Sequence, residues 1–214
     1  MEIGAWDEDE LVRRCKDGSE AAFAELVRRH RPRLYTLAVR LIGDRDAAED
    51  VIQESFVSAF RAIDRFVPRP SLSAWLNTIV IRQAGRTAAR LEKRGGASLD
   101  RMLATDDSAG SGEGTQTSGR PGENDPVAAA EASELRRELA AAIAGLPFAY
   151  RAAVVTRFVM EMDYAEAAAS LQVNLNTYKS HLLRGTKMLR EALDAERATG
   201  TPRAAATFRS RADL

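Results

Sequence analysis

Residues 174–190, NLNTYKSHLLRGTKMLR, form an acid-free basic segment in a chain whose charges balance overall. The 214 residues carry 31 Lys and Arg against 31 Asp and Glu, and this segment holds basic residues but no acidic one. On a helix, at about 100° per residue, Tyr178, Leu182, Gly185 and Leu189 share one narrow stripe. The side chains on the opposite side are Lys179, Ser180, Leu183, Arg184 and Lys187. Because ammonium and guanidinium groups bind phosphates and base edges, this side predicts a surface for nucleic acid.

A short predicted helix, YAEAAASL, and a brief turn, QVN, precede the basic segment, with Asn174 as its candidate N-cap. This spacing is typical of a helix-turn-helix, whose second helix enters the major groove with its N-terminal residues toward the bases. A solvated amphipathic helix is the ordinary alternative. Such faces usually mix charge signs because i,i+4 pairs are favourable, and this face does not. The pattern therefore favours DNA recognition.

A second basic helix is predicted over AWLNTIVIRQAGRTAARLEKR. Arg82, Arg86 and Arg90 follow one another at i,i+4,i+8 and so line one face, while Glu92 is the only acidic residue of the segment. By itself such a helix is equally consistent with an ordinary basic surface. Two basic helices in separate parts of the chain suggest one extended partner that is held at two places, and DNA fits that description.

An acidic patch is predicted ahead of both basic helices, in DAAEDVIQESFVSAFRAIDRF. Asp46 and Glu49 have the spacing of a capping box, which would account for Glu49. Asp50, Gln53 and Glu54 fall on the polar side of the same helix. The apolar residues expected to form one buried stripe are Ile52, Phe56, Ala59, Phe60 and Ile63. Since an acidic surface repels DNA, this patch more plausibly meets a basic protein.

Helix signals dominate the rest of the chain and strand signals are nearly absent, so we expect an all-α fold. Asp7 with Glu10 forms another candidate capping box, Ser19 is a candidate cap, Pro32 should kink or interrupt its helix, and Gly43 should end it. The prolines of VPRPSLS break the helical pattern before Ser71 or Ser73 caps the next helix. In FAYRAAVVTRFVMEM, one helical face is expected to hold Tyr150, Val154 and Phe158.

Composition divides the chain into parts. Residues 95–126 are rich in Gly, Ser, Thr and acidic residues and predict a flexible acidic linker. A coil of that length averages roughly 30 Å end to end and extends to about 100 Å. We therefore expect helical domains at 1–94 and 127–194, the second ending in the helix-turn-helix, and a loosely ordered tail at 195–214.

Several functional classes are disfavoured. Cys15 is the only cysteine, which excludes an internal disulfide and a cysteine-based zinc site. The acidic start MEIGAWDEDELVRR is no signal peptide, and no apolar run approaches the roughly 18–20 residues of a membrane span, so a cytoplasmic protein is expected. His30 and His181 lie far apart, and no phosphate loop or nucleophile motif is present. An enzyme, a cofactor and a metal site are not expected.

Taken in order, these motifs resemble the extracytoplasmic-function (ECF) sigma factors, the small two-domain initiation factors of bacterial transcription. AFAELVRRHRPRLYTLAVRLIGDRDAAEDVIQESFVSAFRAIDRF, followed by AWLNTIVIRQAGR, is similar to their promoter-opening domain. LPFAYRAAVVTRFVMEMDYAEAAASLQVNLNTYKSHLLRGTKMLRE is similar to their upstream-element domain. The resemblance covers roughly residues 20–94 and 127–194. It implies core RNA polymerase and promoter DNA as partners, and an inhibitory anti-sigma protein as a further one.

The resemblance also implies roles for single residues. Asp50, Gln53 and Glu54 match the motif that docks on the basic coiled coil of the largest polymerase subunit. The loop from Phe66 to Ser73 matches the loop that holds a flipped base, with Trp75 as a core anchor beneath it. The residues implied at the downstream (−10) element are Phe66, Ser71, Ser73, Arg82, Arg86 and Arg90. Those implied at the upstream (−35) element are Asn176, Thr177, Lys179, Ser180, Leu183, Arg184 and Lys187.

Some positions depart from the family pattern. Arg82 stands where Asn is common, and Gln172 stands at a turn position that is often Gly and that can require positive φ. Asn176 and Tyr178 replace the more usual Gly and Val. These departures leave the recognised sequence open. Two alternatives also stay open: a helix-turn-helix regulator that works without polymerase, and a sigma-like decoy that sequesters an inhibitor.

Overall fold

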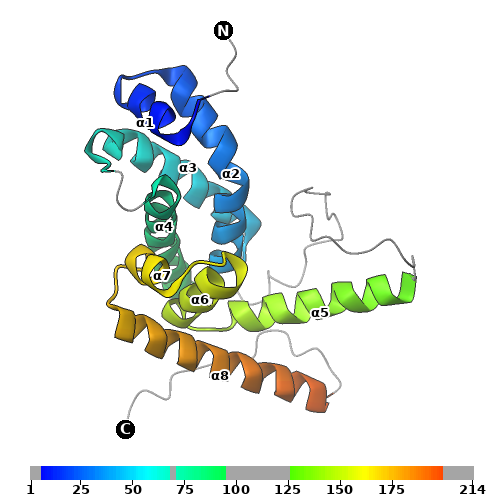
Figure 1. Cartoon of the computed structure of the whole chain (residues 1–214). Helices are drawn as coiled ribbons and strands as arrows, with labels where there is room; N and C mark the ends of the chain where they lie inside the picture. Colours follow the sequence, from blue (N-terminus) through cyan, green and yellow to red (C-terminus); the bar gives the residue numbers. More distant parts are fainter. Residues whose placement is uncertain (1–5, 68–70, 95–125, 200–214) are drawn as a thin grey trace.

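The computed structural model describes residues 6–67, 71–94 and 126–199, and every regular element in these ranges is helical (Figure 1). This confirms the all-α fold. The predicted linker lies almost wholly outside the described residues. The elements are α1 (Glu8–Lys16), α2 (Glu20–Ile42), α3 (Arg45–Ala62), the 3₁₀ turn η1 (Ile63–Arg65), α4 (Leu72–Arg94), α5 (Pro126–Ala144), α6 (Phe148–Val154), the π-helical turn η4 (Val155–Val159), α7 (Tyr164–Ser170) and α8 (Leu175–Thr199).

Helices α1 to α4 form the first helical unit, in which α2, α3 and α4 each pack against the other two. Their apolar stripes meet in one core, because each helix carries aliphatic side chains at helical spacing. Large, almost completely buried side chains come from all four helices: Leu11, Leu26, Leu37, Leu41, Val51, Ile52, Leu72, Leu76 and Val80. This core fixes the exposed faces of α3 and α4, on which the predicted site residues lie.

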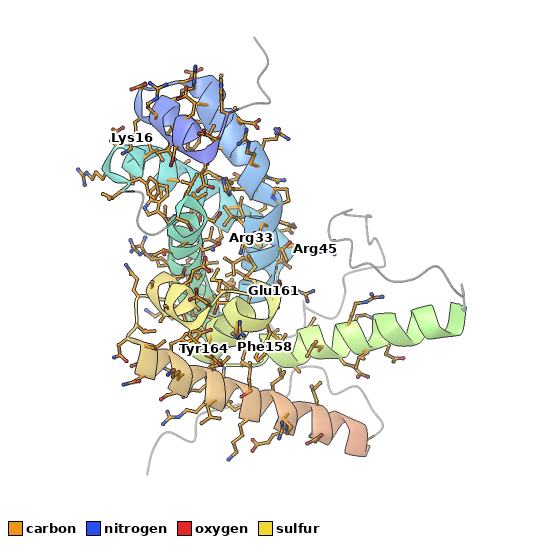
Figure 2. The ribbon with its side chains drawn as sticks, in the orientation of Figure 1. Lys16, Arg33, Arg45, Phe158, Glu161 and Tyr164 are labelled. Atoms are coloured by element: carbon orange, nitrogen blue, oxygen red, sulfur yellow. The ribbon has the colours of Figure 1, made fainter. Side chains whose placement is uncertain are left out.

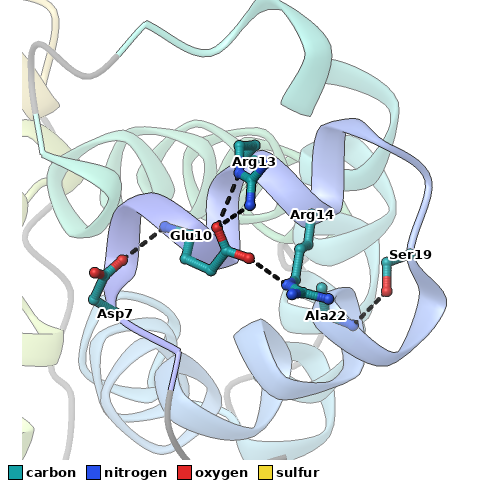
Figure 3. A network of polar contacts seen from close by, with 6 residues as sticks. All are labelled: Asp7, Glu10, Arg13, Arg14, Ser19 and Ala22. Atoms are coloured by element: carbon teal, nitrogen blue, oxygen red, sulfur yellow. Dashed lines mark hydrogen bonds and ion pairs between the residues drawn. The ribbon is translucent and has the colours of Figure 1, made fainter.

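The first two helices begin where the sequence predicts (Figure 3). The Asp7 carboxylate accepts a hydrogen bond from the backbone N–H of Glu10 at 2.8 Å, and the Ser19 hydroxyl accepts one from Ala22 at 3.3 Å. In a capping box the Glu10 carboxylate would also accept from the backbone N–H of Asp7. Here that carboxylate accepts hydrogen bonds from Arg13 and Arg14 instead. Each start thus satisfies orphan N–H groups with a side-chain oxygen.

The predicted capping box at the start of α3 is wrong. Asp44, two residues earlier than Asp46, caps the helix and accepts from the N–H of Ala47 at 2.8 Å. The two carboxylate oxygens of Glu49 instead accept hydrogen bonds from Nη2 of Arg31 on α2, at 2.7 and 2.8 Å. An ion pair to a neighbouring helix therefore replaces the local bond that the sequence pattern suggests.

Pro32 does not interrupt α2, which is continuous from Glu20 to Ile42. Proline removes the hydrogen bond to the carbonyl four residues earlier, at a cost of about 3 kcal/mol. Leucines before and after the proline, Leu26 and Leu34, are both buried in the same core, so packing holds the two halves in one helix. Gly43 ends the helix as expected, at φ 82°.

Helices α5 to α8 form the second helical unit, built on the crossing of α6 and α8. The regular face predicted from Tyr150 through Phe158 does not form. Beyond Val154 the chain widens into the π-helical turn η4, which changes the period, and Phe158 consequently lies on the surface, 61% exposed. The predicted boundary of the tail also differs, since α8 continues to Thr199.

Candidate nucleic-acid interface

Helix α8 begins at a well-defined turn. The Asn174 side chain accepts a hydrogen bond from the N–H of Thr177 at 2.8 Å, which confirms Asn174 as the N-cap. The turn that joins α7 to α8 contains Gln172 at φ 56°, in the left-handed region that favours glycine. The helix-turn-helix predicted from the spacing is therefore present, and Gln172 adopts the positive φ that its position suggested.

The inner side of α8 anchors it to α6. Tyr178 is completely buried, and its hydroxyl donates to the carbonyl of Ala153 at 3.2 Å. Burial raises the pKa of the Tyr178 hydroxyl. At Gly185 the helices approach so closely that a Cβ would lie 2.9 Å from Cγ2 of Val154 and 3.0 Å from the carbonyl oxygen of Tyr150. The orientation of α8 is thus fixed from behind.

The outer side of α8 presents the residues that the sequence placed there. Thr177, in the first turn, is partly exposed. The other candidate residues are all exposed: Asn176, Lys179, Ser180, Leu183, Arg184 and Lys187. Leu183 is 72% exposed in the middle of this surface. The Tyr150 hydroxyl accepts a hydrogen bond from Nη1 of Arg184 at 3.4 Å. No sequence pattern assigned Tyr150 to this surface. The outer side therefore combines cations, hydroxyl and amide groups and one apolar side chain.

Helix α4 carries the second basic face. Arg82, Arg86 and Arg90 are all exposed along it. Two of them are steadied by neighbours one turn earlier: Arg86 donates to Gln83 at 3.2 Å and Arg90 to Thr87 at 3.3 Å. The guanidinium groups thus line one side of α4, as the i,i+4,i+8 spacing predicts.

The connection into α4 is held at both ends. The Ser71 hydroxyl accepts from the N–H of Ala74 at 3.2 Å and so caps α4, while Ser73 is half-buried in the first turn. At the other end, Lys16 of α1 donates to the carbonyl of Phe66 at 2.7 Å. Phe66 is 4% exposed, and its ring centre lies 5.1 Å from that of Trp75. In this structure the Phe66 and Trp75 rings therefore support the connection from below. Residues 68–70 lie outside the described ranges.

The acidic patch lies on the outer face of α3, where Asp50, Gln53 and Glu54 are all exposed. Two apolar side chains, Val57 and Phe60, continue the same face at 49% and 53% exposure. The prediction that Phe60 belongs to the buried stripe is wrong: its ring contacts the Phe23 ring edge-on, with ring centres 5.0 Å apart, and is 53% exposed. A helical wheel would have found both, since position 57 lies within about 20° of position 50, and position 60 within about 20° of position 53.

Acidic and basic faces thus occupy different helices. Among the described residues, α3 presents acid beside exposed apolar groups, whereas α4 and α8 present rows of cations. Such a separation supports two unlike partners, a basic protein surface and a polyanion. Within the described ranges, no helix combines the length and the apolar run that crossing a membrane requires.

Comparison with known families agrees with this geometry. The model of sigma-70 region 2 matches residues 26–94, and that of sigma-70 region 4 matches residues 136–189. The first match contains α3 and α4, and the second contains the helix-turn-helix. The acidic patch and the two basic faces therefore fall inside the two matched regions.

Curated relatives cover most of the chain. ECF RNA polymerase sigma factor SigE of Mycolicibacterium smegmatis is 33% identical over 82% of this chain, which spans 64% of that relative's length. RNA polymerase sigma factor CarQ of Myxococcus xanthus is 30% identical over 85% of this chain and 95% of its own length. ECF RNA polymerase sigma factor SigW of Bacillus subtilis is 28% identical, with 85% and 94% coverage.

Solved structures share the fold. CnrH, in complex with the cytosolic domain of CnrY, matches with a TM-score of 0.57 at 22% identity, over 88% of this chain and 98% of that one. RpoE of Bartonella quintana, in complex with the anti-sigma factor NepR, matches with a TM-score of 0.54 at 24% identity, over 82% and 98%. From its two family regions and its full-length relatives, the chain belongs to the ECF sigma factors, alternative sigma factors that direct transcription initiation by RNA polymerase.

Proposed function

We propose that three separate faces divide the work of this sigma factor. The face of α3 docks on core RNA polymerase, the face of α4 with the connection before it contacts the downstream promoter element, and the outer side of α8 contacts the upstream element. The observation that carries this proposal is the segregation of charge: the acidic face and the two basic faces lie on different helices.

The docking face combines two kinds of interaction. Asp50 and Glu54 supply negative charge and Gln53 an amide, and exposed Val57 and Phe60 supply apolar surface beside them. An acidic helix face attracts a basic partner and repels DNA, while a half-exposed aromatic ring is the kind of side chain that anchors protein interfaces. We therefore assign Val57 and Phe60 to the same contact.

At the downstream element, the arginines of α4 would contact the DNA while the preceding connection holds a base out of the stack. Unstacking a base costs a few kcal/mol, so the holding loop must be firmly supported. The Lys16–Phe66 bond and the Phe66–Trp75 ring pair provide that support. Phe66 would then support the loop from its buried side, and Ser71 and Ser73, at the start of α4, would contact the DNA strand.

At the upstream element, the first turns of α8 would enter the major groove. Lys179, Arg184 and Lys187 can neutralise phosphates or bond guanine, and Ser180 can bond either. Leu183 is exposed in the middle of this face, which suits contact with a thymine methyl group. Asn176 and Thr177 stand at the helix start, where N–H groups favour phosphate.

The remaining assignments follow from these roles. We assign residues 1–94 to polymerase docking and the downstream element, 95–126 to the linker, 127–194 to the upstream element and 195–214 to a tail. Such a factor works in the cytoplasm with polymerase and DNA, and performs no catalysis of its own. CnrH was solved in complex with the cytosolic domain of CnrY, and RpoE of Bartonella quintana with the anti-sigma factor NepR. An anti-sigma partner is proposed for this chain as well.

Reversing charge on α3 tests the proposal. The double variant Asp50→Lys with Glu54→Lys should no longer co-purify with core RNA polymerase, because two attractive contacts become repulsive. A matched control, Asp9→Lys with Glu20→Lys, makes the same change in net charge on exposed residues of α1 and α2, and it should still co-purify. Unchanged polymerase binding by the α3 variant would rule out this docking face.

A further inference from the structure

One aromatic residue outside the helix-turn-helix reaches the outer side of α8. The helix-turn-helix consists of α7 and α8, whereas Tyr150 belongs to α6, which packs against the inner side of α8. Figure 2 shows α8 passing under α6 and α7, with nitrogen-tipped side chains on its far side. Tyr150 is half-buried, and its hydroxyl lies at the exposed side chain of Arg184. This residue therefore links the inner contact of α8 to its outer surface.

The backbone of Tyr150 lies against a glycine of α8. A Cβ at Gly185 would lie 3.0 Å from the carbonyl oxygen of Tyr150 and 3.3 Å from its Cβ. Distances this short mean that the two helices meet here with no side chain of α8 between them. Because Gly185 directly follows Arg184, this close approach of α6 falls beside the arginine.

The ring of Tyr150 packs on a second residue of α8. Its centre lies 5.5 Å from that of His181, with an interplanar angle of 65°, which is an edge-to-face arrangement. Nδ1 of His181 is buried, so this edge of the imidazole faces the protein. His181 and Gly185 are one turn apart, at i and i+4. Tyr150 therefore covers a single turn of α8, and its ring is held from two sides.

The hydroxyl of Tyr150 holds an arginine of the candidate DNA surface. It accepts a hydrogen bond from Nη1 of Arg184 at 3.4 Å. An exposed arginine has many rotamers, and ordering it on binding costs conformational entropy. A hydroxyl that accepts from a guanidinium also keeps its own hydrogen to donate, and phosphate oxygens are good acceptors. Tyr150 thus restricts Arg184 and adds a neutral donor beside it.

We propose that Tyr150 is a positioning residue for recognition of the upstream promoter element, because its hydroxyl orients the Arg184 guanidinium toward the DNA. This inference rests on the proposed function, since it assumes that the outer side of α8 contacts DNA. A guanidinium distinguishes guanine through a bidentate pair of hydrogen bonds, which requires one defined orientation. An arginine that rotates freely keeps its charge but loses base discrimination.

A positioning role and a purely structural role predict different salt behaviour. The hydroxyl is neutral, so its removal leaves the number of cations that face the DNA unchanged. The salt dependence of binding counts neutralised phosphates, with a log–log slope of about −0.9 for each. Tyr150→Phe should therefore reduce base discrimination at an unchanged slope. Loss of α8 packing would instead weaken the phosphate contacts as well and make the slope shallower.

The test uses holoenzyme reconstituted from the full-length chain and core RNA polymerase. The probe is a pool of random-sequence DNA duplexes, and sequencing of the bound fraction gives the base preference at each position. The salt slope is then measured on the most enriched duplex. Tyr150→Phe keeps the ring and removes only the hydroxyl. Its matched control is Tyr35→Phe, a half-buried tyrosine on α2 that also lies beside an arginine, Arg31. Arg184→Ala, alone and combined with Tyr150→Phe, completes a double-mutant cycle.

We expect Tyr150→Phe to lower the base preference about three- to tenfold at the position whose preference Arg184→Ala removes, with the salt slope unchanged. The hydroxyl should have no effect in the Arg184→Ala background, and Tyr35→Phe should match the unmodified chain. Equal preferences with and without the Tyr150 hydroxyl, or a loss that persists without Arg184, would overturn the positioning role. A lower preference together with a shallower salt slope would overturn it too.

The same measurements separate this inference from the proposed function. If Arg184→Ala removes a base preference and Tyr150→Phe does not reduce it, only the role of Tyr150 fails. If Arg184→Ala leaves every preference unchanged, the upstream face of the proposed function fails, and the role of Tyr150 fails with it.

Discussion

Gln172 holds a backbone conformation that glycine adopts without strain. Its φ is 56°, between α7 and α8. A non-glycine residue there costs about 1–2 kcal/mol, while glycine adds about 0.4–1 kcal/mol of unfolded-chain entropy. Gln172→Gly should therefore stabilise the protein by about 0.5–1 kcal/mol in urea unfolding. Gln172→Ala keeps the strain and should gain nothing; an equal gain from both would show that backbone strain is not the cause.

Glu25 links folding to pH. It is 3% exposed, and hydrogen bonds from Arg28 and Arg29, at 2.6–2.7 Å, lower its pKa from 4.5 to about 2. Because the folded pKa is the lower one, the stabilisation is present above about pH 4.5 and is lost as pH falls toward 2. Glu25→Gln should flatten this part of the curve of unfolding free energy against pH. Glu20→Gln, which removes an exposed carboxylate from the same helix, is the matched control; identical curves for both variants would contradict the assignment.

At the scale of single residues, sequence predicts best where the cause is local. Asn174, Ser19 and Asp7 cap helices through bonds to residues three positions away, and all three were predicted. Glu49 was not, because its partner Arg31 lies 18 residues earlier on another helix. The positive φ at Glu161 had no sequence signal, whereas the one at Gln172 was suggested by the family pattern.

At the scale of elements, the crossing of α6 and α8 depends on one glycine. In most helix interiors Gly→Ala is stabilising, by about 1 kcal/mol. Gly185→Ala should have the opposite sign and destabilise by about 1–3 kcal/mol, because its Cβ would lie 2.9 Å from Val154 and 3.0 Å from the Tyr150 carbonyl. Thermal unfolding measures the effect. Gly145→Ala, where a Cβ meets only ordinary contacts from 3.5 Å, serves as control. A stabilised Gly185→Ala would contradict this packing.

Elements were predictable wherever one period holds throughout. Helices α3, α4 and α8 keep a single helical period, and most of the candidate site residues on them are exposed. Two departures from the predicted elements have tertiary causes. Packing on both sides of Pro32 keeps α2 whole, and the π-helical turn η4 rotates Phe158 out of the predicted face.

At the scale of the whole molecule, the two units and their charges follow from the sequence, but their contact does not. Charge runs and composition mark the acidic and basic helices directly. The junction between the units, by contrast, is formed by Arg33 and Arg151 on backbone carbonyls and by the Phe148 ring on Gly85. Every residue offers a carbonyl, so no sequence pattern identifies which one an arginine will reach.

We propose that this chain directs core RNA polymerase to promoters through separate faces on α3, α4 and α8. Run-off transcription on a promoter library, with purified chain and core polymerase, tests it most directly. The account predicts transcripts from a subset of promoters that share two spaced elements. It also predicts their loss with Asp50→Lys and Glu54→Lys, and a changed subset with Leu183→Ala. Tight, polymerase-independent binding to DNA, with no transcripts from any promoter, would contradict it.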